Sequence, residues 1–118
     1  MQTWKLNTAT EYFLLIAKGS KRFEARVPDK TNPKKHYHKI KTGDQIIIVN
    51  DRDPEQILSF KAGKVFVFRD LKQAWENFDC KLINDDNISY EKFVKRILAH
   101  PGYKERILEN GFCIIELI

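Results

Sequence analysis

The sequence predicts a single α+β domain, residues 1–118, built on a small, mostly antiparallel β-barrel flanked by helices. Strand-like runs rich in β-branched and aromatic residues dominate residues 20–68. Helical spacing of apolar residues begins at Asp70, and a last apolar run at 112–117 ends the sequence. A succession of strands followed by helices is typical of the α+β class. A chain of 118 residues has room for one domain around one core.

The first elements are a short strand and a helix. Trp4 and Leu6 alternate with polar neighbours, which predicts a strand. Thr8 and Glu11 have the spacing of a capping box, so we expect the next helix to be capped by Thr8 and to bury one apolar face. Gly19 is typical of the end of such a helix, because glycine adopts left-handed backbone geometry.

The middle of the chain carries further strands. After a predicted strand at 21–27, residues 28–43 are the least regular segment, with two prolines and several lysines. The isoleucine-rich run 45–50 is typical of a strand covered on both faces. A turn at 51–54 leads to one or two further strands in 57–68, with Gly63 as a bulge or turn.

Three helices and a final strand complete the prediction. Asp70 and Gln73 cap a helix whose inner face holds Leu71, Ala74, Trp75 and Phe78. The second helix is expected to bury its apolar residues, which are Tyr90, Phe93, Val94, Ile97 and Leu98. A short third helix spans 103–108 and ends at Gly111. We expect the strand at 112–117 to return and pair beside the first strand, because an isolated strand would leave its backbone unpaired.

Composition narrows the class of protein. A hydrophobic fraction of 42% and eight phenylalanines indicate a packed globule. No apolar run approaches the length of a membrane span, and the N-terminus lacks a signal-peptide pattern, so we expect a cytoplasmic protein. Cys80 and Cys113 lack metal-ligand spacing and are expected to be reduced thiols, and no metal or cofactor is expected. A net charge of +5 modestly favours an anionic partner.

The segment Gly19 to Arg26 is the candidate functional motif. It places Lys21, Glu24 and Arg26 at a tight helix-to-strand corner. Glu24 and Arg26 share the strand parity that points away from the apolar face. They are therefore candidates for a binding or catalytic cluster. The alternatives are a solvated face on an edge strand and a structural ion pair that ties the strand to a neighbour.

The chemistry of this cluster suits recognition. Glu24 beside Arg26 should stay ionised, so its carboxylate could accept hydrogen bonds from exocyclic amines. The Arg26 guanidinium could donate to a base edge or a phosphate. Burial of Lys21 would lower its pKa and make it a candidate general base.

A basic segment, 34–41, interleaves aromatic residues with lysines. Lys35, Tyr37 and Lys39 combine phosphate attraction with a stacking ring, which is the usual pattern for binding single-stranded RNA. A solvated surface loop is an equal alternative. Trp4 and Tyr37 are the rings that we expect to face solvent. The aromatic residues Phe66, Phe68, Trp75 and Tyr103 have spacings typical of the core.

These features together resemble the ASCH domain family, a branch of the PUA-like β-barrels. The first motif is Gly-x-Lys-x-x-Glu-x-Arg, residues 19–26. Three weaker motifs follow in the family's order, and they are Gly43, Asp44 and Ile46, then Val65 to Leu71, then Gly111 to Ile118. The resemblance implies a cleft beside the barrel, lined by Lys21, Glu24 and Arg26, that binds RNA or a nucleotide-like ligand.

One bacterial branch of the family hydrolyses N4-acetylcytidine. It uses a lysine at the place of Lys21, a threonine two residues before the motif's arginine, and a glutamate in the loop before the second helix. Here Glu24 occupies the place of the threonine, and the loop offers Asp85 and Asp86. Other members of the wider family have been described as ribonucleases.

The sequence thus favours a monomeric module that binds RNA, a nucleotide or a modified nucleoside. The alternative is a small hydrolase, an amidohydrolase or ribonuclease, in which Lys21 acts as base and Glu24 orients water. A third class, a protein-interaction accessory domain, fits the basic segment equally well.

Overall fold

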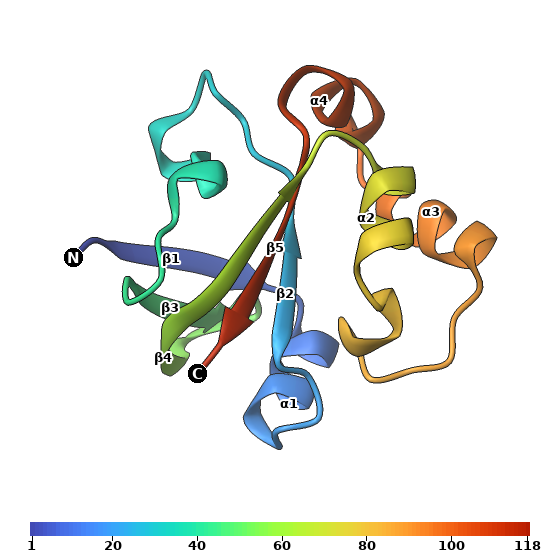
Figure 1. Ribbon diagram of the computed structural model, residues 1–118. Helices are drawn as coiled ribbons and strands as arrows, with labels where there is room; N and C mark the ends of the chain where they lie inside the picture. The colour runs from blue at the N-terminus through green and yellow to red at the C-terminus, as the bar shows by residue number, and fades with distance from the viewer.

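A computed structural model describes residues 1–118 and contains five strands, four α-helices and three short 3-10 turns. The α+β class is confirmed (Figure 1). The strands are β1 Thr3–Thr8, β2 Phe23–Arg26, β3 Gln45–Asn50, β4 Asp53–Phe68 and β5 Phe112–Leu117. The α-helices are α1 Thr10–Ala17, α2 Leu71–Asn77, α3 Tyr90–Leu98 and α4 Tyr103–Asn110, and the 3-10 turns are Pro33–Lys35, Tyr37–Lys39 and Cys80–Leu82.

The strands form one sheet in the order β1-β3-β4-β5-β2. Only the β1–β3 pair is parallel, which confirms the mostly antiparallel arrangement. The long strand β4 pairs with β3 along its first half and with β5 along its second half. The register shifts between Ala62 and Val65, so the bulge predicted at Gly63 is confirmed. The single continuous strand β4 therefore changes its pairing partner halfway along its length.

The sheet curls but does not close. β1 and β2 stand at the two ends of the strand order and share no backbone ladder, so an open seam separates them. The predicted pairing of the last strand with the first is wrong, because β5 lies between β4 and β2. The residues Phe112 to Ile115 are completely buried, and a strand that is apolar on both faces requires a central position.

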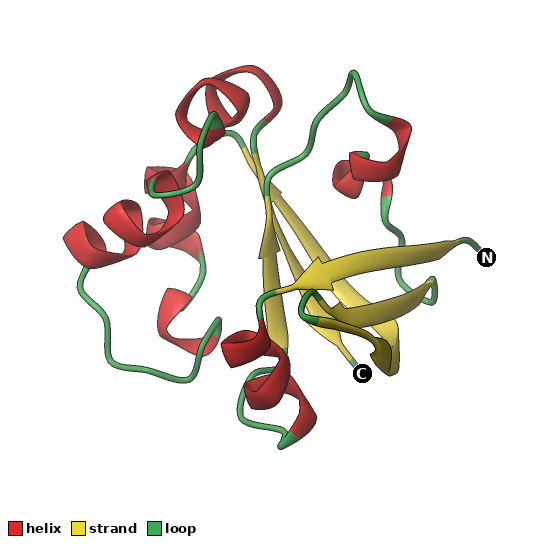
Figure 2. Cartoon of the chain, turned by 180° about the vertical axis from the view of Figure 1, so that it is seen from behind, coloured by secondary structure: helices red, strands yellow, loops and turns green.

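Two hydrophobic clusters lie on opposite faces of the sheet, and β5 contributes to both. Its alternating residues Cys113, Ile115 and Leu117 enter one cluster, which α1 and the turn at 37–39 complete. Phe112 and Ile114 enter the other cluster, beneath α2, α3 and α4. Figure 2 shows the strands between this helical group and the loop that carries the first two 3-10 turns.

The start of α1 differs from the prediction. Ala9 is the N-cap residue and makes no side-chain cap, while the Thr8 hydroxyl donates to the carbonyl oxygen of Leu6 at 3.3 Å. Thr8 is the last residue of β1, and its side chain makes a hydrogen bond within that strand instead of capping the helix. The predicted capping box is therefore wrong. Gly19, with φ of +84°, ends the segment in the left-handed region as expected.

The predicted cap of α2 is confirmed, since the Asp70 carboxylate accepts from the Gln73 backbone N–H at 2.8 Å. The prediction that Trp4 and Tyr37 face solvent is wrong, because both rings are buried in the first cluster. The Trp4 indole N–H donates to Asp44 Oδ2 at 3.0 Å, so its polar edge finds a partner inside the protein. No helix of the chain has both the length and the apolar character needed to cross a membrane.

Candidate functional site

A cavity of about 290 Å³ opens where β1, α1, β2, α3 and α4 meet. The three motif residues Lys21, Glu24 and Arg26 all line it. Its size is at the lower end of the roughly 300–1,000 Å³ range of small-molecule pockets. The cavity therefore has room for one small ligand, such as a single nucleoside, and not for a stretch of several nucleotides.

Local geometry explains how the motif reaches this cavity. Gly19 turns the chain, and the backbone N–H groups of Ser20 and Lys21 both donate to the carbonyl oxygen of Leu15, at 3.0 and 3.1 Å. Along β2, Glu24 and Arg26 then point to the face opposite to that of Phe23, which packs against the helical cluster. The predicted alternation is confirmed, but Glu24 and Arg26 do not point away from the apolar residues, because their partners in β5, Ile115 and Cys113, belong to the first hydrophobic cluster.

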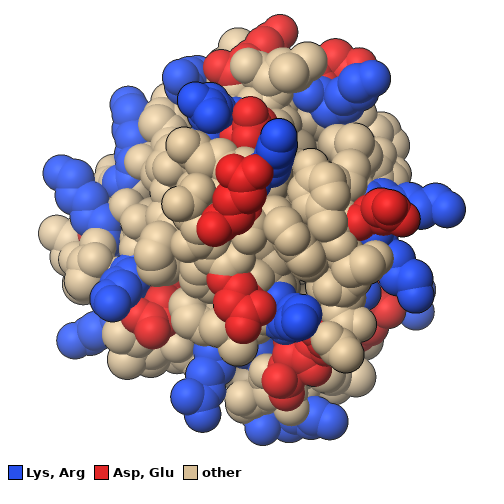
Figure 3. All heavy atoms as spheres, turned by 45° about the vertical axis from the view of Figure 1, so that its right-hand side comes forward, with Lys and Arg blue, Asp and Glu red and all other residues tan.

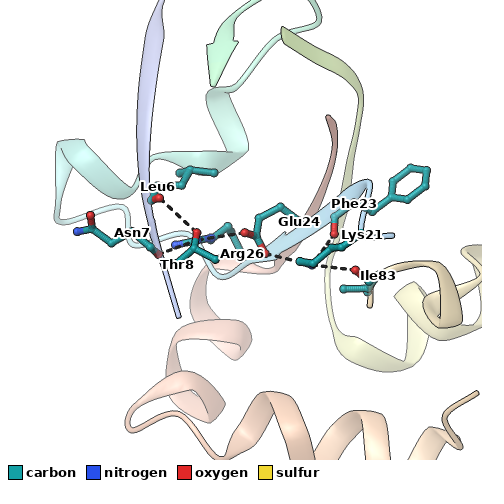
Figure 4. Close-up of polar contacts among 8 residues, drawn as sticks. All are labelled: Leu6, Asn7, Thr8, Lys21, Phe23, Glu24, Arg26 and Ile83. Carbon is teal, nitrogen blue, oxygen red and sulfur yellow. Dashed lines mark hydrogen bonds and ion pairs between the residues drawn. The ribbon is translucent and has the colours of Figure 1, made fainter. Parts of the chain in front are cut away.

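Lys21 has no hydrogen left to offer a ligand. Its Nζ donates to the carbonyl oxygens of Phe23 at 2.6 Å and Ile83 at 2.8 Å, and it lies 3.4 Å from Glu24 Oε1 (Figure 4). Burial lowers the pKa of Lys21, and the neighbouring Glu24 carboxylate partly offsets that effect. Three acceptors around one amine suit an ammonium group, which has three donors and no lone pair. Lys21 therefore links the start of β2 to the loop that contains Ile83.

Glu24 lies between two cations. Its Oε1 faces Lys21, and its Oε2 lies 3.3 Å from Arg26 Nη2, while only 8% of its side chain is exposed. Burial raises the pKa of Glu24, but the two cations outweigh it and hold the pKa of this carboxyl below its ordinary value. A carboxylate has about four lone-pair sites, and these two partners occupy two of them. Glu24 is thus an ionised acceptor with capacity left for a ligand.

Arg26 spans the open seam of the sheet. Its Nη2 donates to the carbonyl oxygen of Asn7 at 2.8 Å and to the Thr8 hydroxyl at 3.0 Å, both in β1 (Figure 4). The guanidinium also lies 5.8 Å from the centroid of the buried Tyr37 ring. All its hydrogen bonds within the protein use Nη2. The N–H groups of Nη1 and Nε remain available to an acceptor in the cavity.

Residues that the motif analysis did not single out complete the walls. Tyr12 of α1 and Tyr103 of α4 line the cavity, and His100 stacks on Tyr103 with ring centroids 4.7 Å apart. Arg96 of α3 also lines it and pairs with Asp86 at 2.8 Å. The spacing of Tyr12 and Tyr103 indicated only apolar helix faces, since sequence spacing does not show which helix ends meet.

The other candidate residues lie away from this cavity. Lys35 and Lys39 are exposed and do not line it, and Tyr37 lies buried beneath Arg26. Their contact with RNA stays a prediction, and the Tyr37 ring is not open to stacking with a base. Asp85 and Asp86 do not line the cavity either, although Asp86 reaches it indirectly through Arg96.

The charge of the cavity is nearly balanced. Its lining holds three cationic side chains, Lys21, Arg26 and Arg96, and two carboxylates, Glu24 and Asp51. On the helical side of the surface, Lys and Arg alternate with Asp and Glu without a broad area of one sign (Figure 3). This balance suits a ligand of little charge better than a polyphosphate. No group of three His, Cys, Asp or Glu side chains is placed to hold a metal ion.

Comparisons with solved structures identify proteins of the same fold. No family model and no curated protein matches the sequence. Among solved structures, "hypothetical protein PH0355" superimposes with a TM-score of 0.78 at 26% identity, covering 98% of this chain and 97% of that one. Protein PF0455 from Pyrococcus furiosus has a TM-score of 0.68 at 19% identity, with coverage of 98% and 96%.

A third solved structure is also similar to this chain in fold. It is the ASCH protein from Zymomonas mobilis, with a TM-score of 0.61 and 12% identity, covering 99% of this chain and 67% of that one. The chain therefore shares the fold of this ASCH protein. The resemblance predicted from the sequence motifs is confirmed at the level of the fold.

Proposed function

We propose that this domain binds a single nucleobase, either as a free nucleoside or nucleotide or as an unpaired base of RNA, in the cavity beside β2. The observation that carries the proposal is the pairing of an ionised acceptor with a free donor. Glu24 retains acceptor sites, and Arg26 retains the N–H groups of Nη1 and Nε. Both belong to one strand and line one cavity.

This donor–acceptor pair matches the edge of particular bases. Cytosine and adenine present an exocyclic amine next to a ring nitrogen acceptor, so the amine would donate to Glu24 and the ring would accept from Arg26. Uracil instead presents its N3–H between two carbonyl oxygens, so one carbonyl oxygen would lie beside the carboxylate when N3–H donates to Glu24. We therefore expect cytidine and adenosine to bind more tightly than uridine.

The aromatic walls add a second means of recognition. Tyr12, His100 and Tyr103 provide π surfaces around the cavity, and stacking on an aromatic ring contributes about 1–3 kcal/mol per base. For an RNA ligand, the exposed Lys35 and Lys39 would attract the phosphate backbone outside the cavity. Binding of a free nucleoside should accordingly depend little on salt, and binding of RNA should depend on it strongly.

The state of Lys21 favours binding over hydrolysis. A general base needs a lone pair, but this amine faces three acceptors. Chromatography of N4-acetylcytidine and of RNA after incubation with the protein should therefore show unchanged material. Product formation that disappears in a Lys21→Met variant would contradict a purely binding role.

Calorimetric titration with cytidine, adenosine, uridine and a six-nucleotide single-stranded RNA tests the proposal. Arg26→Lys keeps the charge but loses the forked donor, and we expect it to weaken cytidine binding by about tenfold or more. Arg22→Lys is the matched control, since Arg22 lies within the same segment but is exposed and makes no side-chain hydrogen bond or ion pair within the protein. Absence of binding to every ligand, or equal losses in both variants, would overturn the proposal.

A further inference from the structure

A second concave surface lies between α2, α3 and α4, and it shares no residue with the cavity described above. This apolar groove has a volume of about 230 Å³. It is lined by Leu71, Tyr90, Val94, Leu98, Ile107 and Leu108, with charged residues only at its rim. The groove has room for one or two large apolar side chains.

The wall formed by α3 is a continuous apolar stripe. Tyr90, Val94 and Leu98 follow one another at i, i+4 and i+8, and such residues lie on one face of a helix. The sequence spacing predicted that Tyr90 and Leu98 would be buried, but they are 37% and 36% exposed, so that prediction is wrong. The physical reason is that Phe93 fills the space beneath α3 and no element of the chain covers the neighbouring stripe.

On the opposite wall, an apolar side chain is even more exposed to solvent. Leu108 of α4 is 76% exposed, although Ile107 beside it is buried in the helical cluster. Single exposed apolar residues are common, but a groove that gathers several of them marks an interaction site. A pattern typical of a core is therefore present here without the element that would complete the core.

The charges around the groove indicate what kind of partner completes it. Lys72 and Lys104 line the rim, are exposed and have no ion-pair partner. The single acidic residue of the lining, Asp70, already caps α2 and lies 3.5 Å from Arg69. The groove thus presents an apolar floor between two free cations.

We propose that this groove docks an acidic, apolar segment of another protein, in which leucine-sized or aromatic side chains are flanked by Asp or Glu. The apolar side chains would fill the space between α3 and α4, and the flanking carboxylates would meet Lys72 and Lys104. A second copy of this chain fits less well, because a two-fold contact over this groove would bring the lysines of both copies together. The proposal is independent of ligand binding in the cavity.

Selection of a random 12-residue peptide library, displayed on phage, against the whole domain tests this proposal. We expect the enriched peptides to combine Leu, Phe, Met or Trp with Asp or Glu. Fluorescence anisotropy with a selected peptide should then show binding that weakens about tenfold or more in Leu98→Lys and in Leu108→Lys. Leu14→Lys is the matched control, because Leu14 is 57% exposed on α1 and should leave binding unchanged.

A charge-reversed variant separates the two parts of the proposal. Lys72→Glu combined with Lys104→Glu leaves the apolar floor intact, so we expect loss of the preference for acidic peptides over matched peptides in which Lys replaces Asp and Glu. The proposal is overturned if no peptide is enriched or if selected peptides bind the groove variants as tightly as the native domain. It is also overturned if sedimentation shows a dimer that Leu108→Lys dissociates, because the groove would then serve a second copy.

Discussion

The Arg26 side chain of β2 donates to the carbonyl oxygen of Asn7 in β1 at 2.8 Å, across the seam where the sheet lacks a backbone ladder. One guanidinium therefore links the two edge strands and also lines the candidate binding cavity. A ligand that engages Arg26 would act on the residue that links the two edges of the sheet. Binding in the cavity and the stability of the seam should accordingly be coupled.

Arg26→Lys should loosen this seam. The lysine side chain is one bond shorter than the arginine side chain, so its Nζ does not reach the position of Nη2, from which the guanidinium contacts Asn7, Thr8 and Glu24. We expect a loss of about 1–3 kcal/mol of unfolding free energy. Hydrogen exchange followed by mass spectrometry should show faster exchange in β1 while β3 and β4 keep their protection. Uniform acceleration over the whole sheet would contradict a local role at the seam.

Glu24→Gln should destabilise the domain severely. The amide keeps the shape of the carboxylate but leaves the charges of Lys21 and Arg26 without a counter-ion in a buried setting. Removal of one partner from a buried ion pair costs about 3–5 kcal/mol. Urea unfolding measures this change, and Glu76→Gln on the exposed surface of α2 is the control. Equal midpoints for the two variants would show that Glu24 is not a central counter-ion.

Asp44 should make the free energy of unfolding of the domain depend on pH in the acidic range. Hydrogen bonds from the backbone N–H of Lys41 and from the indole of Trp4 lower the pKa of Asp44. Because the folded pKa lies below the unfolded one, this stabilisation is complete above the unfolded pKa and is lost as the pH falls through the folded pKa. Asp44→Asn should cost about 1–3 kcal/mol at pH 7.

The difference between Asp44→Asn and the native domain should shrink as the pH falls, because the native carboxyl also loses its charge. Thermal unfolding between neutral and acidic pH would record this convergence. Asp85→Asn, at an exposed position, serves as the control. A constant difference over the whole pH range would contradict the role of the Asp44 charge.

Two glycines with similar backbones allow a test of close packing. Gly102 and Gly111 have φ of +79° and +85°, but an added Cβ meets nothing at Gly102 and lies 2.5 Å from the carbonyl oxygen of Phe68 at Gly111. Alanine is strained by positive φ at both sites and clashes only at Gly111. We expect Gly111→Ala to cost about 1–3 kcal/mol more than Gly102→Ala in urea unfolding. Equal costs would show that β4 moves aside freely.

The features that the sequence predicted correctly are those that depend on local residue patterns and on the motif. The strand at 45–50, the bulge at Gly63 and the Asp70 cap follow from periodicity and from residues with special backbone chemistry, and each is confirmed. The parity of Glu24 and Arg26 likewise placed them together on one face of β2. The motif around them also predicted the fold that the chain shares with the ASCH protein from Zymomonas mobilis.

The errors concern side chains and helix faces whose partners the sequence pattern does not identify. The hydroxyl of Thr8 could serve a helix or a strand, and only the folded β1 shows that it serves the strand. Burial of Tyr37 depends on the loop folding beneath Arg26, and the exposure of Leu98 depends on Phe93 taking the inner position on α3. Periodicity identifies an apolar face but does not show whether another element covers it.

The central claim is that Arg26 and Glu24 hold one nucleobase inside the cavity. A titration with cytidine, followed by NMR of the arginine side-chain Nε–H signals, tests it most directly. We predict a saturable shift of the Arg26 signal, no shift of the Arg22 signal and a weaker response to uridine. An Arg26 signal that stays in place at saturating cytidine, or one that moves together with that of Arg22, would contradict the claim.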